Sequence, residues 1–190
     1  HLKSVLDGAY VDWTDESNTH YLMPNMPVKK ALIDILNHSI IIPRLSAHYG
    51  FEFYCKAVSV FKTQASAKMG TTSVNFHRDG HPPFTHKLMI YLTTVEESSG
   101  AFSFKPGSNV KMILPTFGSY NYKRGLDEIN YNKLSLYGDA GTKILFKNNA
   151  LHAGGRTEKG ERVVVTFLLH PRFLSRQNNS VQAIDWNVGG

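Results

Sequence analysis

The sequence of 190 residues contains a single cysteine, Cys55, so the chain cannot form an internal disulfide. This excludes a fold held together by disulfides and favours a reducing compartment, the cytoplasm. Cys55 lies in a run of β-formers, where we expect a packed small hydrophobe rather than a nucleophile. The sequence also lacks any run near the roughly 20 apolar residues of a membrane span, and its first residues lack a signal-peptide profile. We therefore expect a soluble protein with no membrane partner.

Clustered charge is also scarce. The chain has 21 Lys and Arg against 15 Asp and Glu, a net charge of +6, yet its only adjacent basic pairs are Lys29-Lys30 and Lys123-Arg124. A nucleic-acid-binding β-domain would gather basic and aromatic side chains on one exposed face. The scattered pattern disfavours a nucleic-acid partner and favours a solvated surface that attracts small anionic ligands. Oligomeric state does not follow from these patterns.

Strand-like segments dominate the chain after Glu52. Each is rich in β-branched or aromatic residues and is closed by turn residues such as Ser98-Ser99-Gly100. The segments are residues 53–63, 72–79, 87–95, 101–105, 133–137, 142–147 and 162–170. Because no helical period separates them, they predict an all-β sandwich or jelly roll rather than βαβ units.

The first fifty residues read differently. Residues 10–25 show no period and predict an extended arm on the domain surface. From Pro27, apolar residues at helical spacing predict an amphipathic helix that Pro43 ends or kinks: Val28, Ala31, Leu32, Ile35 and Leu36. We expect one domain, with residues 1–50 as arm and flanking helix and residues 51–175 as the jelly-roll core.

Three residues predict a metal centre. In an extended strand, alternate side chains share a face, so His77 and Asp79 would project side by side. His152, just beyond an apolar run, offers a third ligand. Two histidines and one carboxylate leave positions open on an iron(II) ion, as in non-haem oxygenases. His-x-Asp alone is also found in polar surface turns, which is the alternative for these two residues.

An arginine strengthens the metal hypothesis. Arg162 opens the last strand-like run, and its planar guanidinium can hold a carboxylate in bidentate fashion. Arg156, in a glycine-rich turn, is the competing clamp and is disfavoured because that turn has no fixed direction.

Taken in order, these motifs resemble the phytanoyl-CoA dioxygenase family of Fe(II)/2-oxoglutarate-dependent oxygenases. The resemblance rests on His77-x-Asp79, residues 86–93, residues 100–108, and His152 followed by Arg162. It implies an all-β core folded as a double-stranded β-helix, a cupin-like jelly roll. It also implies that His77, Asp79 and His152 hold Fe(II), and that Arg162 binds the cosubstrate 2-oxoglutarate. The implied reaction is hydroxylation of a small-molecule substrate by dioxygen, with release of succinate and carbon dioxide. The carboxylate of Asp79 favours hydroxylation or desaturation over halogenation.

Other side chains are expected around this centre. Thr166 shares the face of Arg162 and could offer a hydroxyl deeper in the cosubstrate pocket. Lys87 and Tyr91 share a face of the strand after the His-x-Asp loop and could meet the oxo-acid or the substrate. His81 has the parity of His77 and Asp79 and is a candidate substrate contact.

A long connection at residues 115–132 carries Tyr120, Tyr122 and Arg124. Long loops inside compact domains tend to be functional, which predicts a lid that selects substrate; a packed insertion without function is the alternative.

A second functional class remains open: a non-oxidative metal-binding cupin-like protein or an inactive relative. Arg162 favours the oxygenase, because a non-oxidative cupin needs no clamp for a dicarboxylate.

Overall fold

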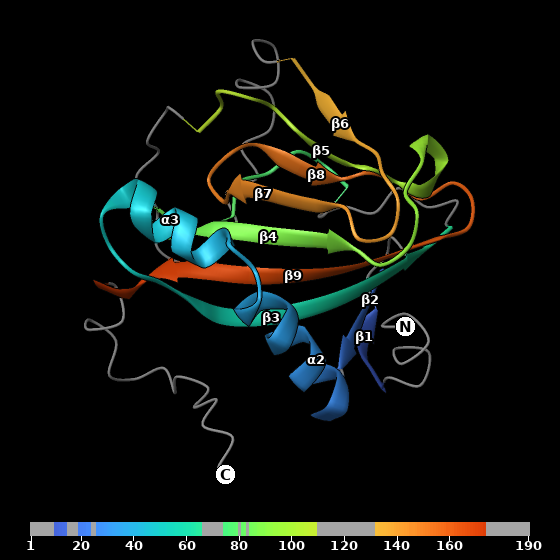
Figure 1. Ribbon diagram of the computed structural model, residues 1–190. Coiled ribbons are helices and arrows are strands. Elements are labelled where there is room, and N and C mark those ends of the chain that lie inside the picture. Colours follow the sequence, from blue (N-terminus) through green and yellow to red (C-terminus); the bar gives the residue numbers. More distant parts are fainter. Residues whose placement is uncertain are drawn as a thin grey trace.

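The computed structural model describes residues 10–14, 19–23, 26–65, 74–79, 81–82, 84–109 and 132–173. Within these ranges two antiparallel sheets form the core (Figure 1). The larger has the order β1-β2-β3-β9-β4-β7 and the smaller β6-β5-β8. The large-sheet strands are β1 (Tyr10–Thr14), β2 (Thr19–Met23), β3 (Phe53–Gln64), β9 (Glu161–Pro171), β4 (His86–Tyr91) and β7 (Lys143–Lys147). The small-sheet strands are β6 (Leu134–Leu136), β5 (Phe102–Phe104) and β8 (His152–Gly154).

The central strand β9 has apolar layers on both faces. Val163, Val165 and Phe167 pack with residues of the two helices, whereas Val164 packs between the sheets against Tyr91 and other buried side chains. Alternation along the strand therefore assigns odd-numbered residues to the helix side and even-numbered residues to the interior between the sheets. This assignment places Arg162, Thr166 and His170 on the interior face.

The predicted helix is confirmed, but its end is not where we expected. Helix α2 (Met26–Asn37) buries Val28, Leu32 and Leu36. It ends before Pro43, which instead lies in the first turn of α3 (Ile41–Tyr49), where a missing N–H removes no helical hydrogen bond. Gly50 caps the C-terminal end of α3: it has a φ of 72° and donates its N–H to the Ser46 carbonyl at 2.9 Å. Among the described residues, no helix is long and apolar enough to cross a membrane.

The N-terminal arm belongs to the sheet. Instead of a surface arm, β1 and β2 pair antiparallel, and β2 pairs with β3 with Thr19 opposite Thr63. A register irregularity between Val11 and Trp13 interrupts β1. Such an irregularity breaks the period-two pattern, which explains why the sequence pattern did not reveal the strand.

Two further strand predictions need correction. Residues 74–79, the described part of the expected strand 72–79, contain only an isolated bridge from His77 to His152. Strand β8, which begins at the third candidate ligand, was not predicted. The expected strand 87–95 ends at Tyr91, and Val95 makes an isolated bridge to Gly138. Tyr120, Tyr122 and Arg124 of the predicted lid lie outside the described residues.

Candidate metal centre

The side chains of His77, Asp79 and His152 converge on one another. Their ligand atoms lie within 4.8 Å of one another, and they form the metal-binding group found among the described residues. The Nε2 atom of His77 is 3.6 Å from Asp79 Oδ1, and the Nε2 atom of His152 is 3.4 Å from Asp79 Oδ2. Asp79 and His152 are buried. The structure therefore brings together the three residues that the sequence pattern selected.

Backbone pairing, rather than a shared strand, sets this convergence. His77 and His152 exchange two backbone hydrogen bonds, of 2.9 and 3.0 Å, although 75 residues separate them. On its other side, β8 pairs with β5, with His152 opposite Phe104. We call residues 74–79 the ligand loop. The His77–His152 bridge holds this loop against β8, so the small sheet sets the separation of the two imidazoles.

Arg78, between the two ligands of the His-x-Asp motif, is a positioning residue that sequence reasoning missed. Its Nε donates to the Asn149 carbonyl at 3.1 Å, and one terminal nitrogen donates to the Ser108 carbonyl at 2.9 Å. The Ser108 hydroxyl in turn accepts the Leu151 N–H at 2.8 Å. Arg78 thus ties the ligand loop to the turn that leads into β8. Its location inside the motif was the available signal.

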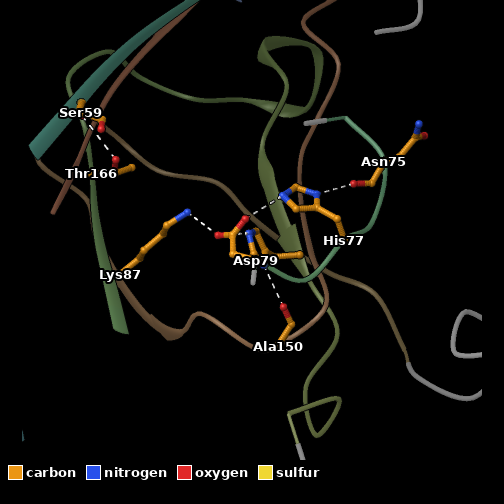
Figure 2. Close-up of polar contacts among 8 residues, drawn as sticks. Ser59, Asn75, His77, Asp79, Lys87, Ala150 and Thr166 are labelled. Atoms are coloured by element: carbon orange, nitrogen blue, oxygen red, sulfur yellow. Dashed lines mark hydrogen bonds and ion pairs between the residues drawn. The ribbon is translucent and has the colours of Figure 1, made fainter. Parts of the chain in front are cut away.

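Backbone carbonyls orient both imidazoles for metal binding. The Nδ1 atoms of His77 and His152 lie 2.8 Å from the carbonyls of Asn75 and Ala150, respectively (Figure 2). A carbonyl only accepts, so each Nδ1 carries the hydrogen, and each neutral ring directs its Nε2 lone pair toward Asp79. Lone pairs facing carboxylate oxygens repel unless a cation lies between them. The donor set and its orientation therefore fit a divalent metal ion.

Lys87 supplies the positive charge nearest to this carboxylate. Figure 2 shows Lys87 and His77 approaching Asp79 from opposite sides, with Lys87 Nζ in direct contact with Asp79 Oδ2. Burial acts to raise the pKa of Asp79, but its contact with His152 and the charge of Lys87 outweigh burial and hold that pKa well below its usual range. Burial and the neighbouring His152 lower the pKa of His77.

Arg162 is buried on the interior face of β9. One terminal nitrogen donates to the Gly100 carbonyl and the other lies 3.5 Å from Thr63 Oγ1. Its Nε has no hydrogen-bond partner, and no acidic side chain of the described residues pairs with it. Burial lowers the pKa of Arg162. The competing Arg156 is exposed. Of the two candidate clamps, only Arg162 is located where a ligand inside the barrel could reach it.

The other residues predicted to contact the cosubstrate or the substrate differ in whether their polar atoms are already hydrogen-bonded within the protein. Tyr91 is fully buried, and its hydroxyl already donates to the Leu136 carbonyl at 2.8 Å and accepts the Phe102 N–H at 3.1 Å. Thr166 lies on the Arg162 face, with its hydroxyl 3.4 Å from the Ser59 carbonyl (Figure 2). His81 is partly buried, and the charge of Asp79 acts on it. Cosubstrate or substrate binding by these residues stays a prediction.

Comparison with solved structures identifies proteins of the same fold. No protein-family model and no curated protein matches the sequence. The non-haem α-ketoglutarate-dependent epimerase SnoN from nogalamycin biosynthesis is 16% identical, with a TM-score of 0.69 over 88% of this chain and 70% of that one. HygX from Streptomyces hygroscopicus, with nickel and 2-oxoglutarate bound, is 14% identical, with a TM-score of 0.59 over 90% and 77%. A 2OG-Fe(II) oxygenase-family oxidoreductase from Burkholderia pseudomallei is 11% identical, with a TM-score of 0.60 over 88% and 75%.

At these identities the similarity establishes the fold. The two facing sheets, the helices packed on the outer face of the larger one, and the solved structures that share this arrangement confirm the predicted class. The chain has an all-β jelly-roll core with flanking helices, the fold of these 2-oxoglutarate-dependent enzymes.

Proposed function

We propose that the protein is an Fe(II)/2-oxoglutarate-dependent dioxygenase that hydroxylates a small-molecule substrate and releases succinate and carbon dioxide. One observation carries the proposal: the Nε2 atoms of His77 and His152 converge on Asp79 inside a barrel that also buries the guanidinium of Arg162, with which no acidic side chain of the described residues pairs. A structural metal alone would need no buried cation nearby. An anionic cosubstrate would account for both features.

Each part of this site has a distinct role in the proposal. His77, Asp79 and His152 would hold the iron and leave positions for 2-oxoglutarate and dioxygen, and the bound iron supplies dioxygen activation coupled to oxidative decarboxylation. The carbonyls of Asn75 and Ala150 keep the imidazoles in the ligating tautomer.

Arg162 would hold the distal carboxylate of 2-oxoglutarate. A buried guanidinium is costly without an anion, and its planar donors match a carboxylate. Tyr91, Phe102 and Val164 belong to one buried apolar cluster between the sheets, which excludes water from that part of the interior. Exclusion of water strengthens the attraction between the guanidinium and the cosubstrate.

The structural neighbours support the cosubstrate assignment by analogy of fold. HygX was solved with nickel and 2-oxoglutarate, and SnoN with Fe3+, α-ketoglutarate and nogalamycin RO. SnoN is an epimerase and SnoK a carbocyclase, so this fold serves several oxidative outcomes in those proteins. We favour hydroxylation here, and a place near the phytanoyl-CoA dioxygenases, on the motif order of the sequence.

The test is an anaerobic titration of the metal-free protein with Fe(II) and then 2-oxoglutarate, followed through the visible charge-transfer band of a chelated 2-oxo-acid. We expect the band in the wild type and its loss in Asp79→Ala. Loss of a charge-assisted bidentate contact predicts that Arg162→Met weakens 2-oxoglutarate binding about 10–100-fold. The exposed Arg156→Met is the matched control and should titrate like the wild type. Tight metal binding without a band would contradict the proposal and leave a non-oxidative metal-binding cupin-like protein.

A further inference from the structure

Three buried polar side chains form a row across neighbouring strands of the large sheet. We call Thr85, Asn148 and His170 the polar row. The Asn148 N–H donates to the Thr85 carbonyl at 3.0 Å, which continues the β4–β7 ladder. The β4–β9 register, with His86 opposite Leu169, places Thr85 opposite His170. Thr85 directly precedes β4, Asn148 directly follows β7 and His170 lies on β9, so the three residues sit side by side.

All three side chains are buried, and each has at least one polar atom without a hydrogen-bond partner among the described residues. Their exposed fractions are 2%, 1% and 2% for Thr85, Asn148 and His170. Among the described residues, the Thr85 hydroxyl, both side-chain polar atoms of Asn148 and Nε2 of His170 find no partner. A buried polar group is normally satisfied, and leaving one unpaired costs free energy. Such groups on three adjacent strands point to one shared binding partner.

The row faces the barrel interior beside the metal centre. The intervening residues His86 and Lys147 lie on the helix side, where both contact the Tyr49 ring. Alternation then directs Thr85 and Asn148 inward. Lys87, two residues from Thr85 and on the same face of the sheet, contacts Asp79. Phe146, two residues from Asn148 and on the same face, has its ring 5.1 Å from the His152 ring. His81 follows Asp79 by two residues, and its ring centroid lies 5.9 Å from that of His170.

The row is separate from the cosubstrate clamp. Along β9, Arg162 and His170 lie near opposite ends of the strand, and the residue opposite Lys87, Leu168, lies between them. A 2-oxoglutarate that extends from the metal to Arg162 would leave the row to another molecule. The natural occupant is the substrate.

The chemistry of the row selects a class of substrate. Burial, with the nearby charges of Lys56 and His81, lowers the pKa of His170 to about 4, so its ring is neutral at pH 7. A hydroxyl, an amide and a neutral imidazole can each donate and accept a hydrogen bond, and none carries a formal charge. Hydroxyl groups also donate and accept, so they match this set better than an ammonium, a phosphate or a hydrocarbon chain.

We propose that Thr85, Asn148 and His170 bind hydroxyl groups of the substrate, which is a polyol or sugar derivative, and orient it beside the metal centre. This inference rests on the proposed function, since it assigns the substrate side of that site. It distinguishes the protein from an oxygenase that binds its substrate through an apolar chain.

The first arm of the test measures thermal unfolding of the metal-free protein. Thr85→Val and Asn148→Leu replace an unpaired polar group by an apolar one of similar size. Each should raise Tm by about 2–4 °C, the shift expected for ~1 kcal/mol in a chain of this length. Ser39→Ala is the matched control, because the Ser39 hydroxyl is also buried without a partner but lies at the α2–α3 junction. A fall in Tm for Thr85→Val would mean that ordered water already satisfies the row and would overturn the inference.

The second arm uses methyl β-D-glucopyranoside as probe and methoxycyclohexane as its analogue without ring hydroxyls. Both are titrated against the Ni(II)-loaded protein while Tm is followed. The glucoside should raise the Tm of the wild type and of Ser39→Ala equally, and by more than methoxycyclohexane does. It should bind at least about tenfold more weakly to Thr85→Val and Asn148→Leu. Equal stabilisation of all variants, or none of the wild type, would overturn the assignment. Because the Fe(II)–2-oxoglutarate band is measured without this probe, failure of the row and failure of the oxygenase are distinguished.

Discussion

Replacing Lys87 by Met should destabilise the metal-free protein but increase its affinity for a divalent metal. The ammonium of Lys87 contacts Asp79 Oδ2, and the side chains are 24% and 7% exposed. Two unit charges at about 4 Å attract by ~4 kcal/mol at an effective dielectric of 20. The partial exposure of Lys87 reduces this, so we expect a loss of about 2–3 kcal/mol and a fall in Tm of about 4–12 °C.

Metal binding should reverse this effect. The ammonium and the metal ion both need Asp79 Oδ2, and they repel each other. Removing Lys87 therefore removes a competitor, and the Lys87→Met protein should bind Zn(II) or Ni(II) more tightly than the wild type. The assay is thermal unfolding with chelator and with a series of metal concentrations, from which the linkage relation gives the affinity.

Lys62→Met is the matched control for this experiment. Lys62 also forms an ion pair, with Glu161 at 3.1 Å, but both side chains are about a quarter exposed, at 28% and 26%. Its loss should cost under about 1 kcal/mol and should not depend on metal. If Lys87→Met changes Tm equally with and without metal, or leaves the metal-free protein unchanged, then Lys87 does not act as the stand-in cation of the site. A separate 2-oxoglutarate titration of the same variant measures whether Lys87 also contacts the oxo-acid.

Three further predictions follow from local features. Gly100→Ala should lower the free energy of unfolding by at least about 1 kcal/mol in a urea titration, because Gly100 has a φ of 78° and the new Cβ would lie 2.4 Å from the Gly155 carbonyl oxygen. The control is Gly141→Ala, at a φ of 98° with open space around the Cβ, which measures the backbone strain alone. Burial raises the pKa of Cys55 to about 12, so the native thiol should react with a disulfide reagent at pH 8 far more slowly than the unfolded thiol, and equal rates would refute its burial. Burial lowers the pKa of His170 from 6.5 to about 4, so the unfolded state binds more protons in this interval and stability should fall by up to about 3 kcal/mol between pH 6.5 and 4. His170→Phe should flatten this part of the stability profile, and an unchanged slope would assign the effect to other groups.

The sequence selected the candidate ligand triad, although it did not predict the local structure around it. The sequence pattern selected His77, Asp79 and His152, on the expectation that one strand carries the first two. The structure instead has a bridge in which His77 and His152 share backbone hydrogen bonds. The three candidate ligands were selected by their chemistry and order, whereas their geometry depends on a pairing between segments 75 residues apart, which no local pattern encodes.

The short strands escaped prediction for a related reason. Strand β8 has only three residues and is followed by Gly155, where a Cβ would lie 2.5 Å from the Ala101 carbonyl. This close approach between β8 and the start of β5 is a tertiary contact. Similarly, β2 joins the large sheet only because β3 presents an open edge to it. In contrast, the long strands β3 and β9 have enough β-branched and aromatic residues to be recognised from sequence alone.

The polar row could not be predicted from the sequence, because residues 85, 148 and 170 are far apart in the chain and only the strand register aligns them. Considered singly, each is an ordinary residue at a strand end. Together with Arg162 they concentrate the unpaired buried polar atoms of the described residues on the interior face, apart from the Ser39 hydroxyl. A fold selected for stability alone would replace such groups by apolar ones. Their accumulation on both sides of one metal-ligand cluster is the arrangement expected when two different ligands complete the interior: an anion at Arg162 and a hydroxyl-bearing molecule at His170.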